Sequence, residues 1–503
     1  MKLDDLARQY SIRHPNDCSC VLMKWHQALW YAAWLGLIVF GLLYRWDVTI
    51  CALNFYFAFW YFAVIVFRCS TVVSTVFGHP EIRIGEAELA ALDYNSLPVY
   101  TILVPLYREA NIARKIIPML DRLDYPKDKL DIKLLLEEDD PATIEAVRQI
   151  PLGKHYDVII VPHGRPKTKP KACNYGLRRA KGELCVIYDA EDRPEPDQLK
   201  KVVLAFRRLP PKIACIQAKL NFYNSNRNLL TRWFTIEYST TFDLFLPGLQ
   251  HADIPMPLGG TSNHFYTRVL EELDGWDPFN VTEDCDLGVR LYRSGYHTRM
   301  IDSTTWEEAC SRLPSWLRQR SRWVKGFFQT HLTHMRNPFR TFRDLGFRGF
   351  CGFVLSVGGS SLMMVLNVLY WVISGTYLVL MLKALAQGHS LFEILKGPRP
   401  PLESSPVWPM LYYGEKEDPL WATLSVVFFT ISVVLLFANL LFVLMHVLAC
   451  MRRRWPRLLP YALLMPLYWV LMSIGAWKGF LQLFTNPFHW EKTPHGLDQP
   501  PAD

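Results

Sequence analysis

The chain has 503 residues, of which 50% are hydrophobic and 20% charged, with a formal net charge of +8. This length and mixture exclude a single small core and favour a chain with both soluble and membrane-embedded parts. Arg and Lys residues beside the membrane segments are sufficient to explain the positive charge. They favour anionic membrane lipid as a partner, and nucleic acid is not an expected one.

Two uncharged apolar runs near the N-terminus predict a helical hairpin in a membrane. They cover residues 25–44 and 48–67, and each is long enough to cross a hydrocarbon layer about 30 Å thick. Residues 1–24 have no early apolar core and no small-residue cleavage site, so we expect a signal-anchor and no cleaved signal peptide. Arg68 and Arg83 flank the hairpin on the side of the next domain, which predicts that this domain is cytosolic.

From residue 98 to about residue 338, short apolar runs alternate with amphipathic stretches of helical period, as in an α/β domain. A helix is expected at 142–149, where Asp140 and Pro141 offer a cap and a first-turn proline. Ligands of α/β sheets bind beyond the carboxyl ends of strands, so residues that follow strands are the first candidates for a site. The expected strands are 100–105, 132–136, 158–162, 184–188, 213–220 and 264–267.

Acidic clusters follow two of these expected strands. One cluster is Glu137 to Asp140 and the other is Asp189 to Asp192. Crowded carboxylates raise each other's pKa values, and a bound divalent cation such as Mg²⁺ or Mn²⁺ would relieve the repulsion. A solvated turn and helix cap explains the first cluster nearly as well, whereas a functional site is favoured for the second.

Two further elements have simple structural explanations when each is taken alone. Thr282 is expected to cap a helix with Glu283 and Asp284 in its first turn, where acids complement the helix dipole. Residues 319–323 belong to a basic, aromatic stretch before the next membrane run, as expected of an interfacial anchor. Arg also binds phosphate and Trp also stacks on sugar rings, so the combination of all these elements points to function.

Three apolar runs follow, and between the last two an Arg-rich stretch, 452–457, predicts a cytosolic connection. Prolines and Lys478 interrupt the last run, so it is either a re-entrant or interfacial helix or a full crossing. The eleven scattered cysteines show no metal-binding spacing and are expected to be reduced thiols. The expected segments are 1–78, 79–338, 339–450 and 451–503.

In this order, the acid pair, Asp-x-Glu, Thr-Glu-Asp and Gln-x-x-Arg-Trp resemble the motifs of the glycosyltransferase family-two membrane synthases of cellulose, chitin and hyaluronan. Bacterial exopolysaccharide β-glycosyltransferases of that family are the most similar. The resemblance covers residues 98–323 and much of the flanking topology. It implies a Rossmann-like glycosyltransferase-A domain in the cytosol, beside a transmembrane helix bundle in the inner or plasma membrane. It also implies inverting, metal-dependent, processive transfer from a UDP-sugar, with UDP-glucose the best guess, to a β-linked polysaccharide that the enzyme helps to translocate.

The resemblance implies a role for each matching residue. Asp284, with Glu283 beside it, matches the general base, and Asp189 and Glu191 match metal ligands. The nucleotide and diphosphate would contact Tyr107, Glu109, Glu138, Asp139, Lys171 and Asp189. The acceptor and diphosphate would contact Gly260, Thr261, Gln319, Arg322 and Trp323. The register of the Glu137–Glu138 pair is open, because the family has an Asp pair there, and Asp192 is an alternative to Glu191.

Residues 486–493 resemble the gating segment of cellulose synthase, which implies a cytosolic C-terminus. This favours four full crossings with interfacial or re-entrant helices, and six crossings are the alternative. Two other functions stay open. One is a non-processive enzyme that transfers a single sugar to a polyprenyl phosphate. The other is a catalytically silent membrane scaffold or transporter. An export partner for the saccharide is left open as well.

Overall fold

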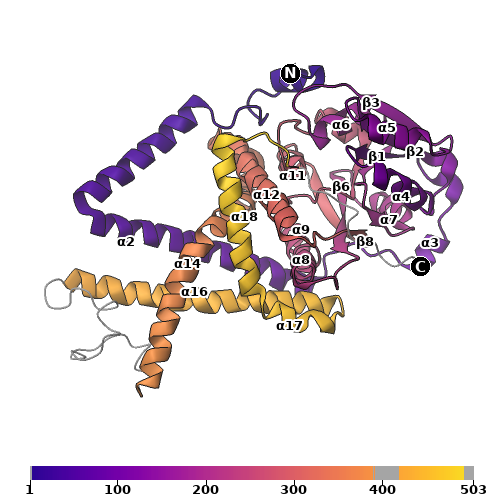
Figure 1. The fold of residues 1–503 in the computed structure, drawn as a ribbon. Coiled ribbons are helices and arrows are strands. Elements are labelled where there is room, and N and C mark those ends of the chain that lie inside the picture. Colours follow the sequence, from indigo (N-terminus) through magenta and orange to yellow (C-terminus); the bar gives the residue numbers. More distant parts are fainter. Residues whose placement is uncertain (1–2, 389, 391–418, 492–503) are drawn as a thin grey trace.

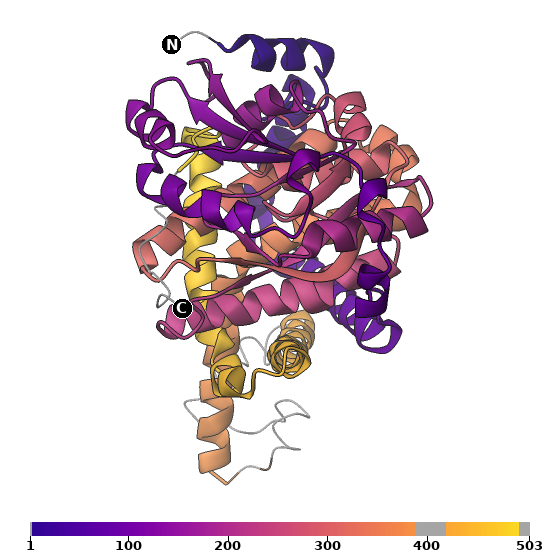
Figure 2. The same cartoon turned by 90° about the vertical axis from the view of Figure 1, so that its right-hand side faces the viewer.

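The computed structural model describes residues 3–388, 390 and 419–491. In this part of the chain an α/β domain with an eight-stranded sheet sits against long apolar helices (Figure 1). Figure 2 shows that α14 (Ser360–Ala386) extends away from the α/β domain, and that α16 (Pro419–Arg452), seen nearly end-on, lies beside it. The predicted fold class, an α/β domain combined with membrane-type helices, is therefore confirmed.

The sheet has the strand order β3-β2-β1-β4-β7-β6-β8-β5. β1 runs parallel to β2 and β4, so the carboxyl ends of these three strands meet at one edge, whereas β7 is antiparallel to both of its neighbours. The residues after β2 and β4 include both acidic clusters, which places these clusters at the same edge. The strands are β1 (Tyr100–Leu106), β2 (Leu130–Glu137), β3 (Tyr156–Val161), β4 (Leu184–Ile187), β5 (Arg193–Pro194), β6 (Ile213–Phe222), β7 (Asn263–Tyr266) and β8 (His297–Glu307).

The six expected strands are all present, and β5 and β8 are additional. β8 escapes sequence reasoning because polar residues such as Thr298, Arg299 and Asp302 interrupt its apolar pattern. It nevertheless pairs in parallel with β6 over most of its length and extends the sheet. Apolar and polar residues do not alternate regularly along β8, because part of the strand contacts helices where an isolated sheet face would contact solvent.

Helices cover the sheet, and the predicted cap of α5 is confirmed, since the Asp140 carboxylate accepts a hydrogen bond from the Thr143 N–H at 3.3 Å. The predicted cap of α11 is wrong: Thr282 occupies the cap position, but its side chain makes no capping hydrogen bond. The helices of this domain are α3 (Glu86–Ala90), η1 (Tyr94–Ser96), α4 (Ala110–Asp121), η2 (Lys127–Lys129), α5 (Pro141–Arg148), α6 (Lys169–Leu177), α7 (Gln198–Arg208), α8 (Leu229–Thr240), η3 (Thr241–Phe245), α9 (Leu246–His251), α10 (Thr267–Glu272) and α11 (Glu283–Arg293).

The predicted hairpin is a single element, α2 (Trp25–Gly78), broken at Arg45 (φ −143°, ψ 71°) into two arms (Figure 1). The second arm continues beyond the predicted end to Gly78, so Arg68 lies inside the helix and does not flank it. In the described part of the chain, four helices are long and apolar enough to cross a membrane, or five if a pair bent by 64° counts as one. The other helices are α1 (Asp5–Arg13), α12 (Leu313–His334), α13 (Pro338–Phe353), η4 (Val354–Gly359), η5 (Pro456–Leu458), α17 (Leu459–Ala462) and α18 (Met465–Thr485).

The Arg-rich turn after α16 joins the bundle to the α/β domain. Arg452 Nη2 lies 3.1 Å from Glu81 Oε2, and Arg453 Nε donates to Asp243 Oδ2 at 2.5 Å. Lys219 Nζ lies 3.2 Å from Glu81 and 3.3 Å from Asp243, so both acids are shared. Two of the arginines expected at anionic lipid therefore serve instead to hold α16 against η3 and β6.

Candidate active site

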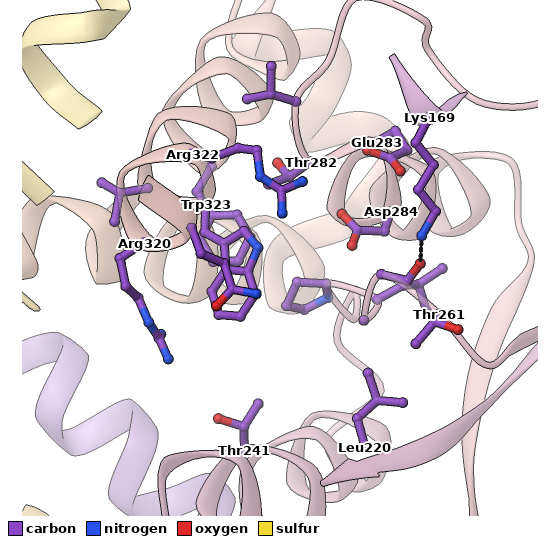
Figure 3. Close-up of a pocket in the computed structure, with 18 of the residues that line it drawn as sticks. Lys169, Leu220, Thr241, Thr261, Thr282, Glu283, Asp284, Arg320, Arg322 and Trp323 are labelled. Atoms are coloured by element: carbon purple, nitrogen blue, oxygen red, sulfur yellow. Dashed lines mark hydrogen bonds between the residues drawn. The ribbon is translucent and has the colours of Figure 1, made fainter. Parts of the chain in front are cut away.

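A cavity of about 1230 Å³ begins at the carboxyl edge of the sheet and continues between the helices of the bundle. Asp189, Asp284 and Trp323 all line it, although they come from three separate segments. In Figure 3, Asp284 points toward the space that Arg322 and Trp323 border from α12, and Lys169 reaches the backbone beside Thr261. The predicted residues on its wall are Tyr107, Glu109, Asp189, Glu191, Gly260, Thr261, Glu283, Asp284, Gln319, Arg322 and Trp323.

Two predicted nucleotide contacts, Glu138 and Asp139, are not among the residues described on this wall. Glu138 Oε2 accepts a hydrogen bond from the His163 N–H at 2.8 Å. Asp139 forms an ion pair with Lys167, whose Nζ lies 3.5 Å from the Tyr107 hydroxyl. Glu138 and Asp139 therefore hold the chain beside Tyr107 at the edge of the cavity. Of the acidic cluster from Glu137 to Asp140, Glu137 is the residue on the cavity wall.

Lys171, predicted to touch the diphosphate, is buried behind the wall. Its Nζ donates to Glu137 Oε2 at 2.9 Å and to the Pro162 carbonyl at 3.0 Å. Lys169, two residues earlier and missed by the sequence reasoning, lines the cavity instead. The signal was present in the Lys-Pro-Lys run, because a helix start presents neighbouring residues in different directions.

Lys169 lies between two acidic parts of the site, the turn that carries Asp189 and the first turn of α11 with Glu283. Its Nζ forms an ion pair with Asp189 and donates to the Gly260 carbonyl at 2.7 Å. Burial lowers the pKa of Lys169, but the carboxylates of Asp189 and Glu283 outweigh burial and raise it. Lys169 is therefore charged, and it offsets the repulsion between acids that come from two distant segments.

The turn after β4 separates its three acids into different roles. Asp192 is buried, and its Oδ2 accepts hydrogen bonds from the Asp189 N–H at 2.7 Å and from the Thr261 hydroxyl. Asp192 therefore shapes the turn, whereas Asp189 and Glu191 line the cavity. Burial, and then the charges of Asp192, Glu191 and Asp189, raise the pKa of the nearby Glu307. Negative charge thus exceeds positive charge here.

Asp189 and Glu191 fit the demand of a divalent cation. No group of three or more His, Cys, Asp or Glu side chains in the described residues is arranged to hold a metal ion by itself. Mg²⁺ at a nucleotide site is ordinarily held by one or two carboxylates together with phosphate oxygens and water. Two carboxylates on the wall, in a region with excess negative charge, match that donor set. The remaining ligands would come from phosphate oxygens and water.

Glu283 and Asp284 form the first turn of α11 at the cavity. Burial raises the pKa of both carboxyl groups, and the charge of Asp284 raises the pKa of Glu283 further. Asp284 Oδ1 accepts a hydrogen bond from the Cys285 N–H at 2.7 Å, which opposes the rise for Asp284. A Cβ atom at Gly260 would lie 3.3 Å from Asp284 Oδ2, so the glycine loop closely approaches this carboxylate.

Helix α12 supplies an aromatic wall that is held from behind. The Trp323 ring packs against Phe234 and Tyr238, with centroids 6.0 and 6.1 Å away. Arg320 lies 4.6 Å over the Trp323 ring, and both of its terminal nitrogens bond to the Glu237 carboxylate. Sequence reasoning missed Arg320 and Glu237, although Glu237 is the only acid in α8.

The segment after α18 lines the cavity and is held by α12. Lys325 Nζ donates to the carbonyls of Asn486 at 3.2 Å and His489 at 2.8 Å, and the Arg322 guanidinium lies 4.3 Å over the Trp490 ring. Residues 485–490 line the cavity. Lys492 and Thr493, the end of the predicted gating segment, lie outside the described residues.

Comparisons with known proteins relate this chain to glycosyltransferases. The model described as glycosyl transferase family 2 matches residues 101–262, and the model described as glycosyl transferase family group 2 matches residues 184–388. "Probable glycosyltransferase YdaM" of Bacillus subtilis is 30% identical over 46% of this chain and 55% of its own length. "Glucomannan 4-beta-mannosyltransferase 2" of Arabidopsis thaliana is 29% identical over 47% of this chain and 45% of its own length.

The two matches overlap. Together they include Asp189, the pair of Glu283 and Asp284, and helix α12. The α/β domain is of the glycosyltransferase-A type, and residues 101–388, which the two models match together, belong to glycosyltransferase family 2. The chain spans about half the length of the curated relatives it matches. Among solved structures, a mannosyltransferase from Pyrobaculum calidifontis in complex with GDP-Man and Mn²⁺ is similar, with a TM-score of 0.41, 18% identity, and coverage of 74% of this chain and 98% of that one.

Proposed function

We propose that this protein transfers a hexose from a nucleotide sugar to a saccharide acceptor, with inversion at the anomeric carbon. One observation carries the proposal: Asp189, Asp284 and Trp323, from three separate segments, line a single cavity. The cavity opens along the carboxyl edge of the sheet, where nucleotides bind in α/β domains. Family membership supports the same reaction class.

The residues of the cavity divide the chemistry between them. Asp284 accepts the proton of the attacking hydroxyl as general base. Lys169 and Arg322 provide positive charge for the leaving diphosphate, whose negative charge develops as the bond to the sugar breaks. Attack opposite the leaving group converts an α-linked donor into a β-linked product. Trp323 offers a flat apolar face to the acceptor ring.

Asp189 and Glu191 would hold Mg²⁺ or Mn²⁺ together with the diphosphate. The metal ion would supply further neutralisation of the leaving group's charge. The excess of carboxylates around Glu307 supports this assignment, because one positively charged side chain, Lys169, does not balance it.

The bundle end of the cavity supports a growing chain as acceptor. Polar and aromatic side chains line it there, from α2, α14, α16 and α18: Tyr61, Asn367, Asn439, Trp469 and Ser473. Hydroxyl, amide and ring groups suit a saccharide, and the Tyr61 hydroxyl, which lies 3.0 Å from Asn367 Oδ1 and 3.1 Å from Asn439 Oδ1, holds these groups in place on the wall. We therefore propose processive synthesis of a β-linked polysaccharide that passes into the bundle, with the α/β domain in the cytosol.

UDP-glucose is the proposed donor on the family resemblance. GDP-mannose is a second candidate, because several relatives are named glucomannan mannosyltransferases. Both donors present the same diphosphate and an α-linked hexose, so the proposed roles of Asp284 and Lys169 do not depend on the choice.

The test is a panel of nucleotide sugars offered to the purified protein with Mg²⁺, Mn²⁺ or a chelator. We expect one donor to give nucleoside diphosphate and a polymer that a β-specific hydrolase degrades, and we expect the chelator and Asp189→Asn to suppress both. A product of one sugar on a polyprenyl phosphate would support the non-processive alternative. No diphosphate release with any donor would contradict the proposed function and leave the scaffold or transporter alternative.

A further inference from the structure

Arg68 is a charged residue in the second arm of α2 that faces the cavity. Its Nη2 donates to the Ser360 hydroxyl at 3.1 Å, and its guanidinium lies 4.7 Å over the Phe245 ring. These contacts from α14 and η3 hold the group in place. They use one of five N–H donors and supply no negative charge.

No ion pair within 4 Å joins Arg68 to a carboxylate of the described residues, whereas three other cations of the cavity wall are paired. Lys167 pairs with Asp139, Lys169 with Asp189, and Arg320 with Glu237. Glu237, which lines the same cavity, is already committed, because its oxygens also accept the Tyr468 hydroxyl at 2.6 Å. Arg68 therefore offers unused positive charge to the cavity.

The position of Arg68 along α2 indicates the level of the lipid headgroups. A crossing of about 20 residues that begins at Val48 ends near Arg68. About two helical turns later, the Thr75 hydroxyl donates to the Leu244 carbonyl of η3 at 2.6 Å, so the helix has reached the α/β domain. An ionisable side chain inside a membrane span is expensive and needs a partner.

The surrounding wall suits a hydrocarbon chain. Beside the polar groups named above, the cavity is lined from α2, η3, α14 and α16 by Val72, Phe245, Met363, Met364, Phe442 and Met445. Unbranched Met side chains adapt to irregular apolar ligands. A fork of N–H donors next to an apolar wall matches a molecule with an oxyanion head and an apolar tail.

We propose that Arg68 binds the phosphate of a membrane lipid whose tail lies against this apolar wall. The lipid is either a resident phospholipid or a polyprenyl phosphate that serves as acceptor, and the second case rests on the non-processive alternative to the proposed function. In both cases the recognised chemistry is the phosphate oxyanion. The lipid binds without any sugar donor, so a failure of this site and a failure of the proposed function are distinguishable.

The experiment measures lipid binding to the full-length protein in neutral detergent by native mass spectrometry. The ligands are a polyprenyl phosphate and phosphatidylglycerol, each compared with its phosphate-free partner, a polyprenol and a diacylglycerol. We expect the wild type to bind at least one phosphate-bearing lipid about tenfold to a hundredfold more tightly than its partner. Arg68→Gln should abolish this preference, and Arg68→Lys should keep part of it.

Arg457→Gln is the matched control, because it removes an exposed charge at the same side of the membrane without touching the cavity. A wild-type protein without preference for phosphate overturns the proposal, whether or not the variants fold. A preference that survives Arg68→Gln, or that Arg457→Gln abolishes equally, also overturns it. Selective binding of polyprenyl phosphate identifies the lipid as the acceptor, and equal binding of phosphatidylglycerol identifies a resident phospholipid.

Discussion

The two ends of the cavity differ in how far their charged side chains are compensated. At the sheet edge, Asp189, Glu191, Glu283 and Asp284 crowd together, and Lys169 compensates only part of their charge. At the bundle end, the pair of Glu237 and Arg320 is bidentate and further bonded to Tyr468, and Arg68 adds one positive charge on the same wall. An excess of one charge suits a ligand that brings the opposite charge, whereas a compensated pair suits structural support. The difference predicts loss of activity at one end and loss of stability at the other.

The largest expected effect is at the sheet edge. Asp284→Asn keeps the shape of the side chain but removes its basicity, so we expect sugar transfer to fall by about 10²- to 10⁴-fold while donor binding is nearly unchanged. Initial rates of diphosphate release and calorimetric donor titration measure the two quantities. Asp253→Asn, which removes a carboxylate that pairs with His297 away from the cavity, is the control. Wild-type turnover in Asp284→Asn would contradict the assignment of Asp284 as general base and the catalytic role of the sheet-edge end of the cavity.

At the bundle end, Glu237→Gln should act on stability. It leaves Arg320, whose side chain is 5% exposed, without a carboxylate, and breaking a buried pair in this way costs roughly 3 kcal/mol. A lower midpoint of thermal unfolding in detergent would report the loss, and Glu145→Gln, on the exposed face of α5, should leave the midpoint unchanged. The double variant Glu237→Gln with Arg320→Gln should regain part of the stability, since no charge remains unpaired. A double variant less stable than either single one contradicts the structural role.

The smallest expected effect is a shift in pH dependence. Burial raises the pKa of Asp284, so its carboxylate takes up a proton at a higher pH than an ordinary aspartate does. The acidic limb of kcat/KM should therefore lie above the usual aspartate range, with activity lost as the pH falls through it. Burial and the charge of Asp284 also raise the pKa of Glu283, which favours its protonated form. Glu283→Gln should then leave the limb nearly in place, and a clear shift to lower pH would show that Glu283 carries charge beside the base.

Much of the fold was predictable because its signals are local. Alternating and continuous apolar runs predicted β1, β2, β3, β4, β6 and β7, and the uncharged runs predicted the α2 hairpin. β8 was not predictable, since its residues are polar by local pattern and become strand through pairing with β6. The same limit explains Lys171 and Lys169: the sequence indicated a lysine near the diphosphate, but which one faces the cavity depends on how α6 packs on the sheet.

The sequence by itself determined the kinds of groups available: acids after strands, an arginine and tryptophan on a helix before the membrane, and apolar runs long enough to cross it. These features can be recognised from residues that are neighbours along the chain, so they do not depend on how the chain packs. Only the tertiary structure decided that Asp189 and Glu283 share Lys169, that Glu237 supports Arg320, and that Arg68 faces the cavity. Each of those contacts joins segments far apart in the chain, and strand order and helix docking, which arise from packing of the whole molecule, bring them together.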